Sequence, residues 1–348
     1  MKILLVHELF MPDFAGGGEK LVYETAKHLI NAGHEVHVLT TGNPSSTHYE
    51  NIPTKRLKRN RFLLNLAFYS IYKQAKWADL IQTATYNGCF PSWIVGKLQR
   101  KPVFLFVMSF WGKQWYALRG KIKGFISKTI ERIQVNRSYT KKIFISDFSK
   151  KFAQEQGINV QQSTIINSGV DTQHYKPLPK EPFILFSGRF AKQKGVDDVL
   201  AVATKLPQHK FVMMGWGEEE ARLKQHAPKN VTFSSMRLKD GKPFFEMYGK
   251  AQIFFLPSYC ETFGLTVVEA MAAGCAIVST VPLKYEGYSC KIGDIEDMVH
   301  NLDKLMKHPQ QTTKMGEKNS QLAKQYTWDK FGKELERVYE EVVKEKRE

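Results

Sequence analysis

Residues 258–278 read SYCETFGLTVVEAMAAGCAIV and predict a loop, a helix and the start of a strand. The apolar run Ile253–Leu256 and Pro257 come directly before this stretch, and the predicted helix begins near Gly264. A strand, a helix and a second strand in succession are the repeating unit of a parallel sheet covered by helices. Because the first N–H groups of a helix have no partner within it, we expect a phosphate site at this helix start.

Short apolar runs alternate with helical patterns along the whole chain. Most of these runs are continuously apolar, as expected for parallel strands that are buried on both faces. The sequence therefore predicts an α/β protein with two doubly wound parallel sheets. The predicted strands are Ile3–Val6, Glu35–Thr40, Leu80–Thr83, Val103–Met108, Lys142–Ser146 and Ser163–Ile166 in the first half, and Phe183–Ser187, Lys210–Met214, Val231–Phe233, Ile253–Leu256 and Ala276–Ser279 in the second.

The segment Asn167–Pro182 divides the two halves, since it is rich in proline and poor in apolar residues. We predict a first domain of residues 1–170, a linker of 171–182, a second domain of 183–325 and a closing amphipathic helix within 326–348. Ligands bind open α/β sheets beyond the carboxyl ends of the strands. We therefore expect the two domains to face a central cleft.

The composition, with 43% hydrophobic and 24% charged residues, is that of an ordinary globular protein. It excludes disordered, collagen-like and disulfide-framework chains. No apolar run approaches the roughly 20 residues that span a bilayer, and the chain start lacks a signal-peptide pattern, so we expect neither feature. The cysteines are scattered without a CxxC pair, which predicts a reducing compartment and no zinc site. They are Cys89, Cys260, Cys275 and Cys290.

The net charge of +17 is concentrated in residues 51–150, which hold 20 Lys and Arg against 3 Asp and Glu. A one-sided field of this kind attracts an anionic surface or polymer. No nucleic-acid-binding signature accompanies it, so we predict no specific nucleic-acid partner. Basic residues beside apolar and aromatic ones favour an anionic membrane surface, and the alternative is a generally basic protein without such a partner.

Two segments carry this charge. Residues 54–61 read TKRLKRNR and precede the apolar run Phe62–Tyr72, and a basic helical pattern extends from Lys113 to Lys142. We predict that the apolar stripe of the second segment packs in the core of the first domain, while its Lys and Arg side chains face the membrane. The stripe consists of Trp115, Leu118, Ile122, Phe125, Ile126, Ile130 and Ile133.

Two further loops follow predicted strands. Residues 187–195, SGRFAKQKG, place Arg189 and Lys194 beyond a strand end, where a guanidinium fork and a mobile ammonium suit a phosphate. Residues 12–20, PDFAGGGEK, contain three consecutive glycines that let the backbone approach an anion closely. This pattern is neither GxGxxG nor GxxxxGK[ST], which disfavours dinucleotide-dependent dehydrogenases and P-loop proteins. Beside such phosphate sites, the carboxylates Glu261 and Glu269 suit the hydroxyls of a ribose or a hexose.

In these residues the chain resembles the GT-B glycosyltransferases, specifically the retaining group called glycosyltransferase family 4. The resemblance spans nearly the whole chain, and the EX7E pattern of the two glutamates together with the Arg–Lys loop is specific. It implies a GT-B fold of two Rossmann-like domains, with the closing helix crossing back onto the first. The matching stretches are GGGEKLVYETAKHLINAGHEVHVLT, IFISDFSKKFAQEQGI, IINSGVDTQHYKP, SGRFAKQKG, ETFGLTVVE and YTWDKFGKELERVYEEV.

The resemblance also implies residue roles. Arg189 and Lys194 would neutralise the leaving diphosphate, and Glu261 would bind hydroxyls of the transferred sugar. Side-chain cations and a helix start would take the developing charge, so we predict no metal and no cofactor besides the nucleotide-sugar co-substrate. The predicted donor-binding residues are Gly17 and Gly18 at the phosphate, Phe263, Gly264, Leu265 and Thr266 at the helix start, Glu269 at the ribose, and Met236 and Arg237 at the nucleobase.

The resemblance implies a retaining hexosyltransferase that moves a sugar from a nucleotide sugar to a lipid-linked or polysaccharide acceptor of the cell envelope. We expect a cytoplasmic protein that lies peripherally on the inner face of the cell membrane. One departure supports an alternative, because relatives usually carry a histidine after the strand where this chain has Met108. A catalytically silent scaffold subunit therefore stays open. An epimerase or a phosphorylase of the same fold is a third interpretation, and an NAD-dependent oxidoreductase lacks its fingerprint.

Overall fold

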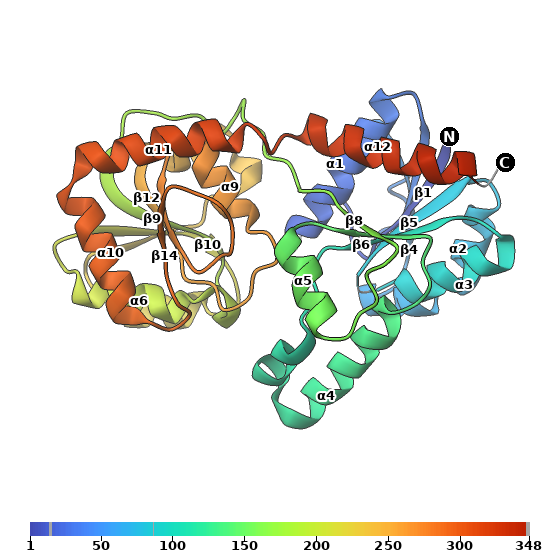
Figure 1. Ribbon diagram of the computed structural model, residues 1–348, viewed down its shortest axis with the longest axis horizontal. Helices are drawn as coiled ribbons and strands as arrows, with labels where there is room; N and C mark the ends of the chain where they lie inside the picture. Colours follow the sequence, from blue (N-terminus) through green and yellow to red (C-terminus); the bar gives the residue numbers. More distant parts are fainter. Residues whose placement is uncertain (14–15, 86, 346–348) are drawn as a thin grey trace. The chain divides into compact units, whose positions relative to one another are not determined.

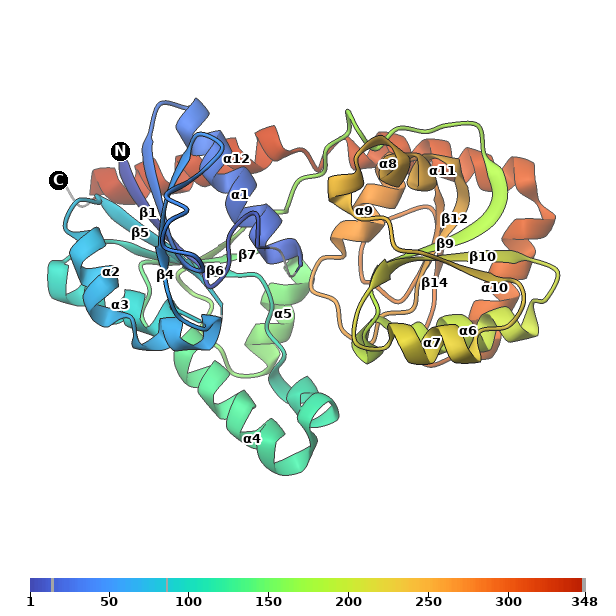
Figure 2. The ribbon, with the colours of Figure 1, turned by 180° about the vertical axis from the view of Figure 1, so that it is seen from behind.

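The structure, a computed structural model, describes residues 1–13, 16–85 and 87–345. They form two compact units, each a mostly parallel sheet covered by helices (Figures 1 and 2), which confirms the predicted fold class. The first unit comprises Met1–Ser168 and the closing segment from Trp328, and the second comprises Gly169–Thr327. Residues 171–182, predicted as a linker, therefore belong to the second unit. The reason is that Tyr175 is only 1% exposed and its ring packs edge-on against Tyr248 at 5.1 Å.

The sheet of the first unit has eight strands in the order β3-β4-β2-β1-β5-β6-β7-β8, and only the pair β3 and β4 is antiparallel. The strands are β1 Lys2–Val6, β2 Glu35–Thr41, β3 His48–Tyr49, β4 Ile52–Leu57, β5 Leu80–Ala84, β6 Val103–Val107, β7 Lys141–Phe144 and β8 Ser163–Ile165. The helices are α1 Gly17–Asn31, α2 Phe68–Ala75, α3 Cys89–Gln99, α4 Trp115–Val135, α5 Asp147–Glu155 and α12 Trp328–Glu345, with short 3-10 turns η1 Arg61–Leu66 and η2 Gly112–Gln114.

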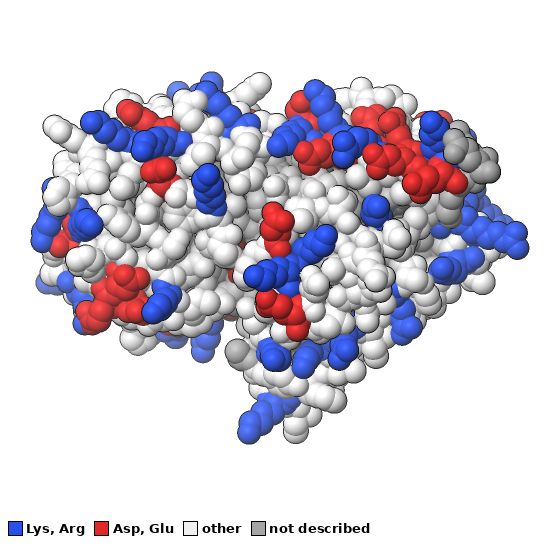
Figure 3. Space-filling model, in the orientation of Figure 1, with Lys and Arg blue, Asp and Glu red and all other residues white. Residues whose placement is uncertain are grey.

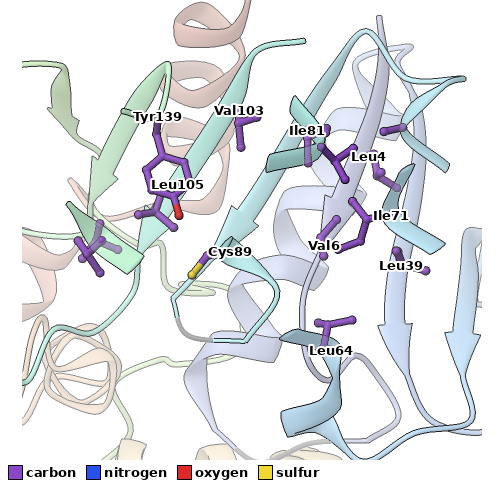
Figure 4. Close-up of a cluster of buried hydrophobic side chains, with 14 of the residues drawn as sticks. Leu4, Val6, Leu39, Leu64, Ile71, Ile81, Cys89, Val103, Leu105 and Tyr139 are labelled. Atoms are coloured by element: carbon purple, nitrogen blue, oxygen red, sulfur yellow. The ribbon is translucent and has the colours of Figure 1, made fainter. Parts of the chain in front are cut away.

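Alternate side chains of β6 point to opposite faces of this sheet. Val103 and Leu105 join a buried cluster with residues of η1, α2 and α3, part of which is drawn in Figure 4. Phe104 and Phe106 lie on the other face, and the ring of Phe104 lies 4.6 Å from that of Tyr339 on α12. Both faces of the strand are therefore buried, which explains why its sequence is apolar at every position.

The closing helix α12 runs beside α1, as both ribbon views show (Figures 1 and 2). Its apolar residues lie on one stripe and are buried against the first unit, namely Phe331, Leu335, Val338, Tyr339 and Val342. The amphipathic pattern of the closing segment thus serves packing within that unit.

The sheet of the second unit has six parallel strands in the order β11-β10-β9-β12-β13-β14. The strands are β9 Glu181–Arg189, β10 Lys210–Trp216, β11 Val231–Ser234, β12 Ala251–Leu256, β13 Ala276–Ser279 and β14 Gly287–Ser289. The helices are α6 Val196–Lys205, α7 Glu220–His226, α8 Lys242–Lys250, α9 Leu265–Ala272, α10 Ile295–Lys307 and α11 Pro309–Ala323, with 3-10 turns η3 Lys192–Lys194 and η4 Leu238–Asp240. β9 lies at the middle of the sheet, so the loops that follow β9, β10 and β12 share one edge.

Candidate functional site

Two of the predicted site loops meet at the carboxyl edge of the second sheet. β9 ends at Arg189, η3 ends at Lys194, and the loop after β12 carries Glu261. Gly195 permits the meeting, because a Cβ on this residue would lie only 1.9 Å from the carbonyl oxygen of Pro257. The two loops therefore pack directly against each other, and Lys194 forms an ion pair with Glu261.

Arg189 forms a second ion pair at this edge, with Glu218. Its Nη2 lies 3.0 Å and its Nε 3.1 Å from the Glu218 Oε2. A Cβ on Gly217 would lie 2.3 Å from the carbonyl oxygen of Phe190, so the loop after β10 is pressed against the loop after β9. Both charged side chains are 50% exposed, and such pairs contribute only about 0–1 kcal/mol. An incoming diphosphate can therefore take the guanidinium from Glu218 at small cost in free energy.

The helix start predicted near Gly264 is present, since α9 begins at Leu265 and Gly264 has a φ of 81°. A Cβ at Gly264 would lie 2.8 Å from Cγ1 of Val281, so a side chain has no room there. Phe263 is buried and packs against Tyr326, with ring centres 5.6 Å apart. The first N–H groups of α9, including that of Thr266, lack intrahelical partners by the geometry of every helix start.

Glu269 lies one turn into α9 and is 7% exposed. The hydroxyl of Tyr248 donates to its Oε2 at 3.3 Å, and the Tyr175 hydroxyl also bonds to this carboxylate. Burial, reinforced by the charge of Glu269, raises the pKa of both tyrosines well above the usual value. Both phenols therefore stay protonated at working pH and hold the carboxylate in one orientation.

The predicted nucleobase residues follow β11 at the same edge of the sheet. Arg237 lies with its guanidinium 4.6 Å from the centre of the Trp216 ring, a cation–π contact. Its backbone N–H donates to Oδ2 of Asp240 at 2.6 Å, which fixes the start of η4. The N–H of Met236 lies 3.4 Å from Oγ of Ser234. Trp216 on β10 pairs in register with Arg189 on β9. The Trp216 ring and the Arg237 guanidinium therefore lie beside the ion pair of Arg189 with Glu218.

Gly17 and Gly18 belong to the first unit and form the first turn of α1. Glu19 closes this turn, since its Oε2 accepts the N–H of Gly16 at 2.8 Å. A Cβ on Gly18 would lie 3.3 Å from Sδ of Met108 and 3.6 Å from Nε2 of His7. Phe14 and Ala15 of the same glycine-rich loop lie outside the described residues.

The prediction that the apolar stripe of α4 packs in the core is wrong. Six of its seven residues are exposed, by 38% to 79%, and among the α4 residues whose side chains the structure describes only Gly124, Glu131 and Val135 are buried. The backbone leaves helical geometry at Gly120, and the first turn folds back against Gly124, where a Cβ would lie 2.7 Å from the Trp115 carbonyl oxygen. We call the exposed residues the α4 stripe: Leu118, Ile122, Phe125, Ile126, Ile130 and Ile133.

The α4 stripe is flanked by basic side chains. The guanidinium of Arg119 lies 5.0 Å from the Trp115 ring and the ammonium of Lys128 lies 5.4 Å from the Tyr116 ring. On the face drawn in Figure 3, the lower protrusion formed by α4 shows Lys and Arg among uncharged residues. The one carboxylate of α4, Glu131, is turned inward and accepts the N–H groups of Trp111 and Gly112 at 2.9 and 2.8 Å.

The other basic segment, residues 54–61, is partly a strand that the sequence analysis did not predict. β4 covers Ile52–Leu57, and Arg56 is buried, with Nη1 3.1 Å from Oδ2 of Asp13. Arg56 therefore contributes nothing to the basic surface. Several apolar side chains that follow residues 54–61 are exposed to solvent. Phe62, Leu66 and Tyr69 are 56%, 66% and 77% exposed.

Two general findings concern the described part of the chain, residues 1–13, 16–85 and 87–345. None of its helices combines the length and the apolar character needed to cross a bilayer. It also contains no group of three or more His, Cys, Asp and Glu side chains arranged to hold a metal ion.

Two family models match the chain. The model described as glycosyl transferases group 1 matches residues 171–322, and the model described as glycosyltransferase family 4 matches residues 15–174. An uncharacterized glycosyltransferase of Methanocaldococcus jannaschii is 25% identical over 98% of this chain and 99% of its own. The alpha-galactosylglucosyldiacylglycerol synthase of Streptococcus pneumoniae is 26% identical over 47% of this chain and 48% of its own. Among solved structures, the Anabaena protein HepE in complex with UDP-glucose superposes with a TM-score of 0.82 at 17% identity, covering 98% of this chain and 100% of that one.

Proposed function

Because the chain belongs to the GT-B glycosyltransferases of family 4, group 1, we propose that it transfers a hexose from a nucleotide sugar to a lipid-linked or polysaccharide acceptor, with retention of configuration. The observation that carries the proposal is the pair of cations, Arg189 and Lys194, at one sheet edge beside the start of α9. Hydrogen-bond donors and cations held in fixed positions stabilise a leaving diphosphate, since its negative charge grows in the transition state.

The two ion pairs suggest how the site changes when the donor binds. A diphosphate carries more charge than a single carboxylate and accepts a bidentate contact from Arg189 in place of Glu218. When Lys194 turns to the phosphate, Glu261 loses its partner and its oxygens become free to accept hydroxyls of the transferred sugar. The N–H groups at the start of α9 add a further anion contact. In this mechanism the free-state ion pairs keep the site neutral until the donor arrives.

Glu269 suits the ribose of the donor. A carboxylate has about four acceptor positions, so Glu269 is suited to accept vicinal hydroxyls as well as the hydroxyls of Tyr248 and Tyr175. The Trp216 ring and the Arg237 guanidinium offer a stacking surface for the nucleobase. The roles of Gly17, Gly18 and Met236 stay predictions.

We propose that transfer needs no metal, because Arg189 and Lys194 supply the positive charge. The test is turnover of a panel of nucleoside-diphosphate sugars with glycolipid acceptors extracted from membranes, in EDTA and then with added Mg²⁺ or Mn²⁺. NMR of the product gives its anomeric configuration. Transfer in EDTA that the double change Arg189→Ala with Lys194→Ala abolishes supports the proposal. The control is Arg222→Ala, an arginine on α7 that is 41% exposed and, like Arg189, is ion-paired to a carboxylate. A strict metal requirement or an inverted product contradicts it.

Met108 supports one second candidate, a silent scaffold subunit. A silent subunit would give no turnover with any donor, yet it would keep its role in the cell. The Glu269→Ala variant separates the two, because a transferase loses its cellular product and a scaffold does not.

The acceptor side of the proposal rests on the first unit. The α4 stripe, the exposed Phe62, Leu66 and Tyr69 and the basic surroundings together suit an anionic bilayer, into which apolar side chains insert while Lys and Arg meet the headgroups. The name of the Streptococcus pneumoniae relative refers to a diacylglycerol glycolipid, which agrees with an acceptor held at a membrane. We therefore propose that the enzyme acts peripherally on the inner face of the membrane.

Flotation with vesicles tests the membrane contact. We expect the protein to float with vesicles rich in phosphatidylglycerol at low salt and to stay unbound with phosphatidylcholine alone. Raising the salt to 0.5 M should weaken the charge component, because the Debye length falls below about 8 Å. A protein that ignores anionic vesicles at low salt contradicts this part of the proposal.

A further inference from the structure

A histidine that the sequence analysis passed over lies at the carboxyl end of β1. His7 is 5% exposed, and its backbone N–H donates to the Leu39 carbonyl at 3.1 Å. Its ring Nδ1 lies 2.7 Å from the carbonyl oxygen of Leu9. A carbonyl only accepts hydrogen bonds, so Nδ1 carries the proton in this contact. In the neutral ring, Nε2 is then a bare acceptor.

The acceptor nitrogen faces the first turn of α1. The position of a Cβ on Gly18 would lie 3.6 Å from Nε2 and 3.7 Å from Cε1 of His7. Met108, at the end of β6, lies at the same place, since its Sδ is 3.3 Å from that position. Within the described residues Nε2 of His7 has no hydrogen-bond partner.

The two described side-chain positions beside Nε2, Met108 and Gly18, supply no donor. The thioether of Met108 has no proton to give, and Gly18 has no side chain. Although His7 is only 5% exposed, its Nε2 is not among the buried atoms that lack a partner, so this atom is within reach of solvent and of a ligand's O–H group. The helix start beside it, with its free N–H groups, suits an oxygen atom of the same ligand.

We propose that His7 binds a sugar hydroxyl through Nε2 and is thereby a specificity-determining residue. The proposal rests on the proposed function, because it takes the ligand at the start of α1 to be a saccharide. The hydroxyl belongs either to the transferred sugar or to the acceptor, and both offer the same O–H donor.

The first test concerns the free protein and needs no turnover. Selective ¹⁵N labelling of histidine, with assignment from His7→Gln, reports the tautomer of His7 by NMR. We expect the Nδ1–H tautomer of the neutral ring. The opposite tautomer would overturn the proposal, because Nε2 would then donate rather than accept.

The second test compares deoxy substrates in the purified enzyme. Deoxy donors that lose a contact to Glu261 or Glu269 should be poor substrates of the wild type and of the His7 variants alike. We expect one deoxy donor or one deoxy acceptor whose loss of about 10- to 100-fold in kcat/KM with the wild type disappears in His7→Phe, and that substrate identifies the source of the hydroxyl. His7→Phe, which keeps a ring but no acceptor, should use the intact and the deoxy substrate equally poorly. His7→Gln, whose amide oxygen can reach the place of Nε2, should restore part of the discrimination. The control is His48→Phe, an exposed histidine on β3.

If His7→Phe and His7→Gln discriminate among all deoxy substrates as the wild type does, the proposal is wrong. A nucleoside-diphosphate-induced rise in melting temperature checks that both variants are folded and retain the diphosphate site of the second unit. Absence of that rise in the wild type itself counts against the proposed function rather than against the tautomer of His7. The two failures are therefore distinguishable.

Discussion

Replacing Ile122 and Phe125 of the α4 stripe by serine should detach the protein from anionic vesicles. The two side chains are 79% and 59% exposed, which together amounts to about 1.4 fully exposed side chains. Full burial of one such side chain contributes about 1.5–3 kcal/mol, so the pair should contribute about 2–4 kcal/mol to insertion. Because each 1.4 kcal/mol is a factor of ten, vesicle binding should weaken by about 30- to 700-fold.

The assay is co-flotation over a range of phosphatidylglycerol vesicle concentrations at low salt. Both replaced residues are exposed, so the melting temperature should change little, as for other surface substitutions within about 0.5 kcal/mol. The matched control replaces Leu98 and Ile292 by serine, two side chains that are 70% and 53% exposed but lie outside α4. The control should bind vesicles like the wild type. Equal binding by the stripe variant and the control would refute the assignment of α4 as the inserting element.

Three further outcomes follow from contacts elsewhere. Tyr248→Phe removes the hydroxyl that orients Glu269, so the KM for the donor should rise about 3- to 30-fold with a smaller change in kcat. An unchanged KM would count against that orienting role. Gly195→Ala should lower the free energy of unfolding by more than 1 kcal/mol and weaken nucleotide binding, whereas Gly241→Ala, also at positive φ but with open space around it, should affect only stability. Burial lowers the pKa of Lys142 to about 8, so the unfolded chain binds more protons between pH 8 and 10.5 and the wild type should gain stability over that window. Lys142→Met should remove this gain, and parallel pH profiles of denaturant midpoints for both proteins would contradict it.

The sheets could be predicted from the sequence because their strands are buried on both faces. β6 and β12 are apolar at nearly every position, and short runs of this kind between turn residues are typical of parallel strands buried on both faces. β4 was not predicted because its sequence, IPTKRL, contains a proline and three consecutive polar residues and so resembles a surface loop. Only the structure shows that Arg56 turns inward to Asp13.

The position of the α4 stripe could not be predicted for a different reason. Helical periodicity shows that one face is apolar, but it does not show what covers that face. Gly120 bends the helix, and the described buried positions of α4, namely Gly124, Glu131 and Val135, provide little apolar anchoring. The α4 stripe therefore stays exposed to solvent within the first unit, where it can contact a membrane or another molecule.

The candidate site shows the same division. Arg189, Lys194 and Glu261 follow strand ends in the sequence, and the structure brings the last two into contact. Glu218 and Trp216 were missed, although the glycines of GWGEEE, residues 215–220, mark a loop pressed against its neighbour. His7 was missed because it lies about a hundred residues from Met108, and only the parallel order of β1, β5 and β6 brings the two strand ends near each other.

Thermal denaturation with nucleoside diphosphates in EDTA tests the central claim most directly. A ligand at about 100 times its Kd stabilises a protein by roughly 2.7 kcal/mol, which in a chain of this size should raise the melting temperature by several degrees. The account predicts such a rise with at least one nucleoside diphosphate for the wild type and none for the variant that lacks both Arg189 and Lys194. No rise with any nucleotide, or an equal rise in the double variant, would contradict the assignment of these two cations as the binding site of the leaving group.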